Sequence, residues 1–224
     1  MPSSKYFLTV STGVFECLTG AGILFGWANL KIVLQKENFF YDISNCNDTN
    51  KTLYDDCIAD LEYSQAASLN KVYIIASMLL GFSTLPNGLL FDKFGTLFTR
   101  VFASSLFLVS CLVLAFADPE SSFLVYIAMS CFSIGGILFL VTNIQTGNLF
   151  PKYRSSIISC MSGSLDSSSV MCLFIKLAYD CGASIQSIFL VFSLLTGYQL
   201  FRYSFTNCIL VKLKNIPVHY MATN

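Results

Sequence analysis

Six long runs of mostly apolar residues divide this chain, and shorter polar segments separate them. The runs cover residues 7–30, 69–91, 97–117, 123–145, 157–179 and 185–206. A helix needs about 20 mainly apolar residues to cross the hydrocarbon core of a bilayer, and every run is long enough to do so. The pattern therefore predicts an all-α, polytopic membrane protein with six transmembrane helices.

The composition agrees with a membrane protein. Hydrophobic residues make up 54% of the 224-residue chain and charged residues 12%, whereas a soluble domain carries about 25% charged residues. The formal net charge is zero, which gives no electrostatic case for binding nucleic acid. The first run is too long for a signal peptide and carries Glu16 inside it, so we expect it to be retained as a helix.

The distribution of charges predicts the orientation in the bilayer. With residues 1–6 in the cytoplasm, most basic residues fall on the cytoplasmic side: Lys5, Lys93, Arg100, Lys152, Arg154, Arg202, Lys212 and Lys214. Acidic residues concentrate instead in the long segment 31–68. Because short cytoplasmic loops are enriched in Lys and Arg, we expect segment 31–68 to be an extracellular loop and residues 207–224 to be a cytoplasmic tail.

The segment 31–68 carries two further signals of an extracellular loop. Asn47 and Asn50 each open an N-glycosylation sequon. Cys46 and Cys57 are candidates for a disulfide, since the extracellular side is oxidising. The other seven of the nine cysteines lie in or beside apolar runs, where Cys usually packs as a small side chain. With His219 as the one histidine, no spacing indicates a metal site.

Ionisable residues inside a span are costly and are therefore functional candidates. Glu16 lies in the first run and Asp166 in the fifth, both beside small polar residues. Asn143 and Gln145 add amide groups near the end of the fourth run. We interpret these four residues as candidate substrate-binding groups on helices that line a cavity. The alternatives stay open: small polar stripes also serve helix packing, and Glu16 also suits a buried structural network.

No sequence motif supports an enzyme. The chain has no G-x-S-x-G nucleophile motif, no nucleotide-binding G-x-x-x-x-G-K-[ST] and no H-E-x-x-H zinc motif. We expect a protein that is not an enzyme and holds no cofactor.

A short charged turn between the second and third runs resembles the cytoplasmic loop between helices two and three of major facilitator transporters. It reads G-x-L-x-D-K-x-G from Gly88 through Asp92 and Lys93 to Gly95, and Arg100 follows. A glycine at position 88 allows close helix approach, and Gly95 permits a tight reversal. The resemblance implies a conformational-gating loop with Lys93 and Arg100 at the cytoplasmic interface.

Further motifs resemble one family of these transporters, which contains the equilibrative nucleobase transporters and the large-neutral-amino-acid uniporters. They lie at residues 22–27, 135–143, 147–150, 154–155, 165–169 and 175–177. Together they are more similar to the nucleobase branch, and the similarity covers nearly all of residues 7–206. The resemblance implies facilitative, ion-independent transport of purine nucleobases such as adenine across the plasma membrane.

The residues are compatible with an uncharged substrate. A planar base would suit aromatic faces together with Asn143, Gln145 or Glu16. A zwitterionic amino acid would instead require a cation or a free helix N-terminus near its carboxylate, and no obvious mid-membrane Arg or Lys is present.

The chain departs from the family pattern in its length. Members have twelve helices in two six-helix halves with the substrate between them, and this chain corresponds to the N-terminal half. We therefore expect it to work in a full-length form or as a homodimer. Two alternatives remain: a large neutral amino acid uniporter, and a non-transporting half-length membrane protein that associates with a full-length relative.

Overall fold

The computed structural model describes residues 3–41, 51–145 and 153–214, and these residues are almost entirely helical, with no strand among them. The helices are α1 (Ser3–Glu16), α2 (Trp27–Lys36), α3 (Lys51–Ala115), α4 (Phe123–Ile144), α5 (Arg154–Ser167), α6 (Ser169–Asp180) and α7 (Ile185–Lys214). Three short turns complete the part of the chain that the structure describes: the π-helical η1 (Cys17–Ala21) and the 3-10 helices η2 (Ile23–Gly26) and η4 (Pro119–Ser121). The predicted all-α class is confirmed.

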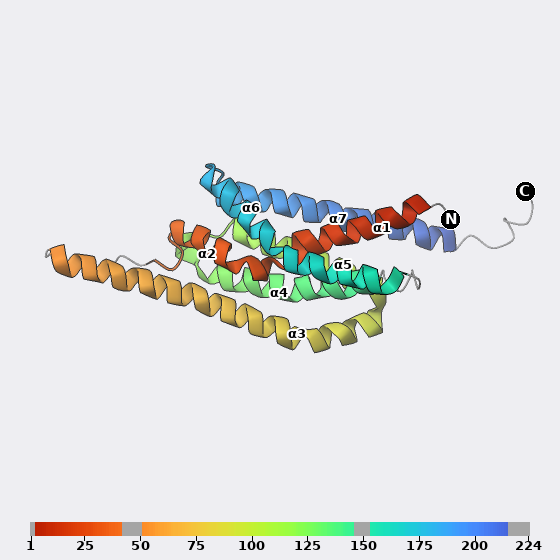
Figure 1. Cartoon of the computed structure of the whole chain (residues 1–224), viewed down its shortest axis with the longest axis horizontal. Helices are drawn as coiled ribbons and strands as arrows, with labels where there is room; N and C mark the ends of the chain where they lie inside the picture. Colours follow the sequence, from red (N-terminus) through yellow and green to blue (C-terminus); the bar gives the residue numbers. More distant parts are fainter. Residues whose placement is uncertain (1–2, 42–50, 146–152, 215–224) are drawn as a thin grey trace, which may run out of the picture.

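The helices run along the long axis of an elongated bundle, with the first part of α3 on one side and α7 on the other (Figure 1). The start of α1 and the end of α7 lie at the same end of the bundle. Buried apolar side chains from η1, α3 and α4 fill its centre, where the Phe107 ring meets Phe132 and Phe139 edge to face, with centroids 4.8 and 5.9 Å apart.

In the part of the chain that the structure describes, three helical segments are long and apolar enough to cross a membrane: 57–115, 123–144 and 154–180. The segments 10–21 and 23–36, bent by 50°, make a fourth if they count as one span. The apolar segment 185–201 is shorter. These lengths fit a membrane protein, while the number of six spans stays a prediction.

The long helix α3 contains two of the predicted spans, because its backbone leaves helical geometry at Gly95 (φ 76°, ψ 175°) and the chain turns back (Figure 1). The part of α3 before Gly95 and the part after it pack against adjacent residues of α4. The Asn87 amide lies 3.5 Å from the Ile134 carbonyl oxygen, and the Ala103 carbonyl lies 3.4 Å from where a Gly135 Cβ would sit. On one straight helix, positions 87 and 103 would be about 24 Å apart.

Two other predicted spans are single runs in the sequence but interrupted helices in the structure. The first changes from α1 to the π-helical η1 after Glu16 and bends by 50° at Gly22. The fifth is interrupted only at Ser168, between α5 and α6, where the backbone keeps helical dihedral angles (φ −65°, ψ −15°). The two breaks pack together, because a Cβ at Gly22 would clash with the Ser168 side chain and the Leu165 carbonyl oxygen. Hydropathy reports the length of a span and does not detect such breaks.

The predicted loop 31–68 is in large part helical, because α2 continues to Lys36 and α3 begins at Lys51. Residues 51–68 lack Gly and Pro, so nothing in them interrupts a polar helix. Hydrogen bonds fix the end of the bundle here. The Gln65 side-chain amide donates to the Phe39 carbonyl oxygen at 2.9 Å, and the Phe40 N–H donates to Ser122 Oγ at 2.9 Å.

Candidate functional site

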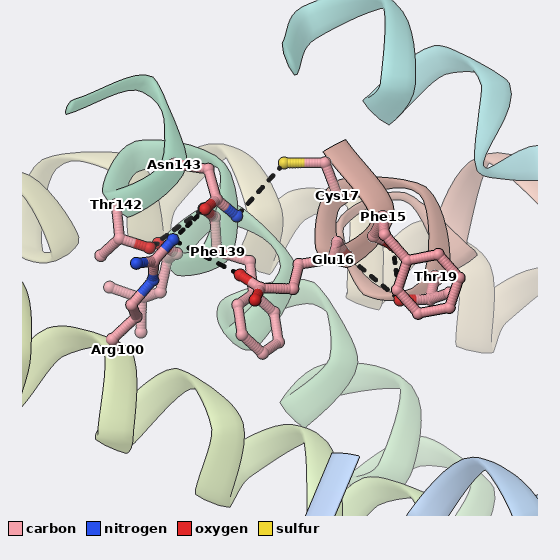
Figure 2. Close-up of polar contacts among 9 residues, drawn as sticks. Phe15, Glu16, Cys17, Thr19, Arg100, Phe139, Thr142 and Asn143 are labelled. Atoms are coloured by element: carbon pink, nitrogen blue, oxygen red, sulfur yellow. Dashed lines mark hydrogen bonds and ion pairs between the residues drawn. The ribbon is translucent and has the colours of Figure 1, made fainter. Parts of the chain in front are cut away.

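A buried polar cluster joins the first, third and fourth predicted spans. Arg100 of α3 forms an ion pair with Glu16 at the end of α1, with 3.4 Å between guanidinium nitrogen and carboxylate oxygen, and also donates a hydrogen bond to Asn143 Oδ1 of α4. Asn143 Nδ2 in turn donates to Cys17 Sγ at 3.4 Å. Figure 2 shows these side chains pointing toward one another from their separate helices.

The cluster is nearly closed to its surroundings. The Glu16 residue is 3% exposed and Asn143 is 0% exposed, whereas the Arg100 side chain keeps 17% of its surface accessible. In such an environment neither charge is stable alone, because burial removes hydration and only the opposite charge replaces it. The two charges cancel, so the cluster is polar but carries no net charge.

Arg100 has partners that the sequence did not predict. The sequence placed it in the conformational-gating loop at the cytoplasmic interface, and that role stays a prediction. In the structure its guanidinium points into the bundle and binds Glu16 and Asn143, two of the residues predicted to bind substrate. Sequence reasoning missed this partnership, although one signal was available: Arg100 lies three residues inside the run 97–117 and is therefore itself an ionisable residue within a span.

The rest of the predicted gating loop lies on the surface. Asp92 and Lys93 are exposed, and the Lys93 ammonium lies 5.5 Å from the centroid of the Phe94 ring. Gly95 forms the expected reversal with its positive φ. The close approach expected at Gly88 does not occur among the described residues, where a Cβ would meet nothing within 4 Å. The gating role of the loop stays a prediction.

Asp166 lies apart from the buried cluster, on an exposed polar face of α5. Ser155, Ser159 and Gly163 are exposed with it and follow the spacing of one helix face. Asp166 is 12 residues after Arg154 and 14 before Asp180, and it therefore lies near the middle of the apolar segment 154–180. A carboxylate at this depth is costly against lipid, so this face requires water, substrate or another protein surface.

Two exposed aromatic rings lie on elements that contact α5 or α6. Phe15 of α1 and Phe25 of η2 are each about half exposed, and their elements pack against α5 and α6. Gln145, the fourth candidate, is half-buried just beyond the C-terminal end of α4. The structure thus unites Glu16 and Asn143 and leaves Asp166 on an exposed face.

Similarity to known proteins agrees with a transporter. The chain is 39% identical over 197 residues to equilibrative nucleobase transporter 1 of Bos taurus, an alignment that covers 87% of this chain. It is 33% identical over 186 residues to large neutral amino acids transporter small subunit 3 of Mus musculus, with 81% of this chain covered. The chain is a homologue of these transporters. It also matches protein FMP42 of Saccharomyces cerevisiae at 26% identity over 176 residues.

The chain spans 39% of the length of the bovine relative and 33% of the mouse relative. No family model matches it. No solved structure matches it either.

The predicted extracellular features of the chain fall mostly outside the described residues. Asn47, Asn50 and Cys46 lie in the segment 42–50, so glycosylation stays a prediction. Cys57 is disulfide-bonded. Its pairing with Cys46 stays a prediction for the same reason.

Proposed function

We propose that this chain takes part in facilitative, ion-independent transport of purine nucleobases such as adenine across the plasma membrane. The observation that carries the proposal is the 39% identity to a nucleobase transporter, against 33% to the amino acid transporters named above. In this proposal the chain forms the N-terminal, six-helix half of a major facilitator fold, with both termini in the cytoplasm and glycans at Asn47 and Asn50.

The charges in the structure favour an uncharged substrate. The guanidinium of Arg100 is engaged by Glu16 and Asn143, so a substrate carboxylate would have to displace Glu16 to reach it. The exposed carboxylate of Asp166 is instead an acceptor that suits the N–H donors of a purine, and exposed Phe rings suit its planar faces. We assign Asp166 the role of the substrate hydrogen-bond acceptor.

A carrier requires more than the helices present here. The chain spans 39% of the bovine relative, and alternating access moves one half of a transporter against the other. The exposed face of Asp166 therefore requires a second surface, from a full-length form of this chain, from a further copy of it or from a full-length relative. The alternative is a non-transporting protein that binds its relative.

Uptake of radiolabelled adenine tests the proposal in cells that lack a nucleobase carrier and express this chain. A glycosidase-sensitive shift in mobility reports how much protein reaches the surface. We expect saturable uptake that excess adenine blocks and leucine does not. Asp166→Asn should lower uptake at equal surface level, whereas Asp118→Asn, an exposed acid in the turn before η4, should not.

Other outcomes have defined meanings. Inhibition by leucine but not by adenine would contradict the nucleobase proposal and favour the amino acid branch, to which the chain is also similar. Absence of uptake at good surface expression would contradict transport by the chain alone, and co-purification with a full-length relative would then favour the non-transporting role.

A further inference from the structure

The buried cluster binds the first span at the two residues where its helix changes type. α1 ends at Glu16, and the π-helical η1 begins at Cys17. Arg100 holds the first of these side chains and Asn143 the second. Single π-helical turns are rare and often mark functional sites, because a wider turn inside an α-helix is intrinsically less favourable.

The same segment is anchored again on the far side of its bend. Cys172 Sγ of α6 lies 3.4 Å from the Ile23 carbonyl oxygen and donates to it. A Cβ at Gly26 would lie 2.9 Å from the Ser169 carbonyl oxygen, so backbone meets backbone closely there. The first span is therefore fixed to α3 and α4 before its bend, and to the break between α5 and α6 after it.

The cluster is also close in sequence to the reversal of α3. Arg100 follows Gly95 by five residues, and Thr99 Oγ donates to the Gly95 carbonyl oxygen at 2.9 Å. Phe15, the exposed ring on α1, precedes Glu16 directly. One arginine side chain thus connects the turn at Gly95 to the segment that carries this ring.

From these contacts we propose that Arg100 is a positioning residue. Together with Asn143 it holds Glu16 and Cys17 at the transition from α- to π-helix, and it thereby sets how the first span presents Phe15 to the substrate. This inference rests on the proposed function. The same pair could serve folding alone, so its test needs a readout that a purely structural role leaves unchanged.

Alkylation of Cys17 reports directly whether Arg100 and Asn143 hold the first span, and the measurement does not depend on transport activity. Cys17 is fully buried, whereas Cys181 in the turn after α6 is exposed and serves as an internal reference. In membranes treated with N-ethylmaleimide, mass spectrometry measures the rates at which the Cys17 and Cys181 thiols are labelled. Removing one partner of a buried pair strongly favours local opening, so Arg100→Gln should speed Cys17 labelling by about tenfold or more, with Cys181 unchanged.

Three further variants complete the alkylation test. Lys71→Gln removes a positive charge from an exposed site on the same helix and should leave Cys17 protected. The reversed pair, Glu16→Arg with Arg100→Glu, should restore protection. Asn143→Ala removes the bond to Cys17 without removing a charge, so it decides the question if Arg100→Gln does not reach the membrane.

Transport kinetics separate positioning from folding. In the uptake assay, Asn143→Ala should raise the KM for adenine about fivefold or more, with Vmax per surface molecule unchanged. The reason is that the variant loses binding energy that the ground state and the transition state share equally. A purely structural role would instead lower the surface level and leave KM alone, and that result overturns the inference.

The two proposals fail in different ways. If the unaltered chain takes up no adenine at good surface expression, transport by the chain alone is contradicted, while Cys17 labelling still decides whether Arg100 and Asn143 hold the first span. If adenine uptake is normal but Cys17 stays protected in both Arg100→Gln and Asn143→Ala, the positioning role is overturned and the proposed function stands.

Discussion

The adjacent glycines 135 and 136 of α4 should respond in opposite ways to alanine. A Cβ at Gly136 would meet the backbone of Ala21 in η1, with the carbonyl carbon at 3.2 Å and its oxygen under 3.0 Å, a distance that Cβ atoms essentially never show. Backbone cannot rotate away as a side chain can. At Gly135 the nearest atom is the Ala103 carbonyl oxygen at 3.4 Å, which is ordinary van der Waals contact.

These distances set the size of the effect. To reach ordinary contact at 3.4 Å, η1 and α4 must separate by more than 0.4 Å at Gly136. Overpacking of this kind costs about 1–3 kcal/mol. Alanine at Gly135 causes no such clash and gains helix propensity, which favours the folded state by up to about 1 kcal/mol.

Thermal unfolding of the purified protein in detergent measures both variants. For a chain of 150–250 residues, 1 kcal/mol shifts the Tm by about 2–4 °C. We therefore expect Gly136→Ala to lower the Tm by about 2–12 °C and Gly135→Ala to leave it unchanged or slightly higher. Equal Tm values for the two variants, or a larger loss for Gly135→Ala, would refute the packing of η1 against α4.

Three further variants test local features of the fold by the same unfolding measurement. Gly95→Ala should cost about 1–3 kcal/mol although a Cβ has open space there, because a φ of 76° strains any residue with a side chain; an unchanged Tm would contradict the reversal at this position. Gln65→Ala should cost about 1–3 kcal/mol, since it leaves the buried carbonyl of Phe39 without its donor, whereas an effect no larger than that of exposed Gln186→Ala would count against this bond. Asp180→Asn removes the 2.7 Å ion pair with Lys36, and because both partners are exposed the Tm should change by less than about 4 °C; a larger loss would show that this contact is shielded from solvent.

The sequence predicted the helical segments well wherever hydrophobic length alone decides. The run 123–145 corresponds to α4 at Phe123–Ile144, and the runs 69–91 and 97–117 fall on either side of the break at Gly95 within α3. Span length is a local property of the chain, since a helix in lipid must be apolar over a fixed number of residues.

The same reasoning failed at the interruptions of the first and fifth spans. Nothing in the local sequence distinguishes Gly22 from other glycines in apolar runs, and Ser168 lies in a series of serines. The two interruptions lie in contact, because the backbone at Gly22 approaches α5 and Ser168 too closely for a side chain. Such a contact is a property of two packed helices, and no window along one helix contains it.

For the candidate site, the sequence identified the ionisable residues and the structure assigned their partners. A charge in a span is recognisable because burial is costly wherever it occurs. Which charge neutralises it depends on helix packing, and Arg100 follows Glu16 by 84 positions in the chain. Of the two interpretations of Glu16, a buried member of a polar network describes its environment better than a residue that faces a cavity, because Glu16 is 3% exposed. Asp166 is exposed, as a residue that lines a cavity must be.

The sequence by itself determined the all-α class, the apolar spans and the similarity to a transporter family, because each depends on residues close together in the chain. Only the tertiary structure decided that Arg100 binds Glu16 and Asn143, that Gly136 rather than Gly135 is crowded, and that the first and fifth spans break side by side. Each of these depends on the separation and rotation of neighbouring helices. Those are set when whole helix surfaces pack together, so they have no signature in any single segment.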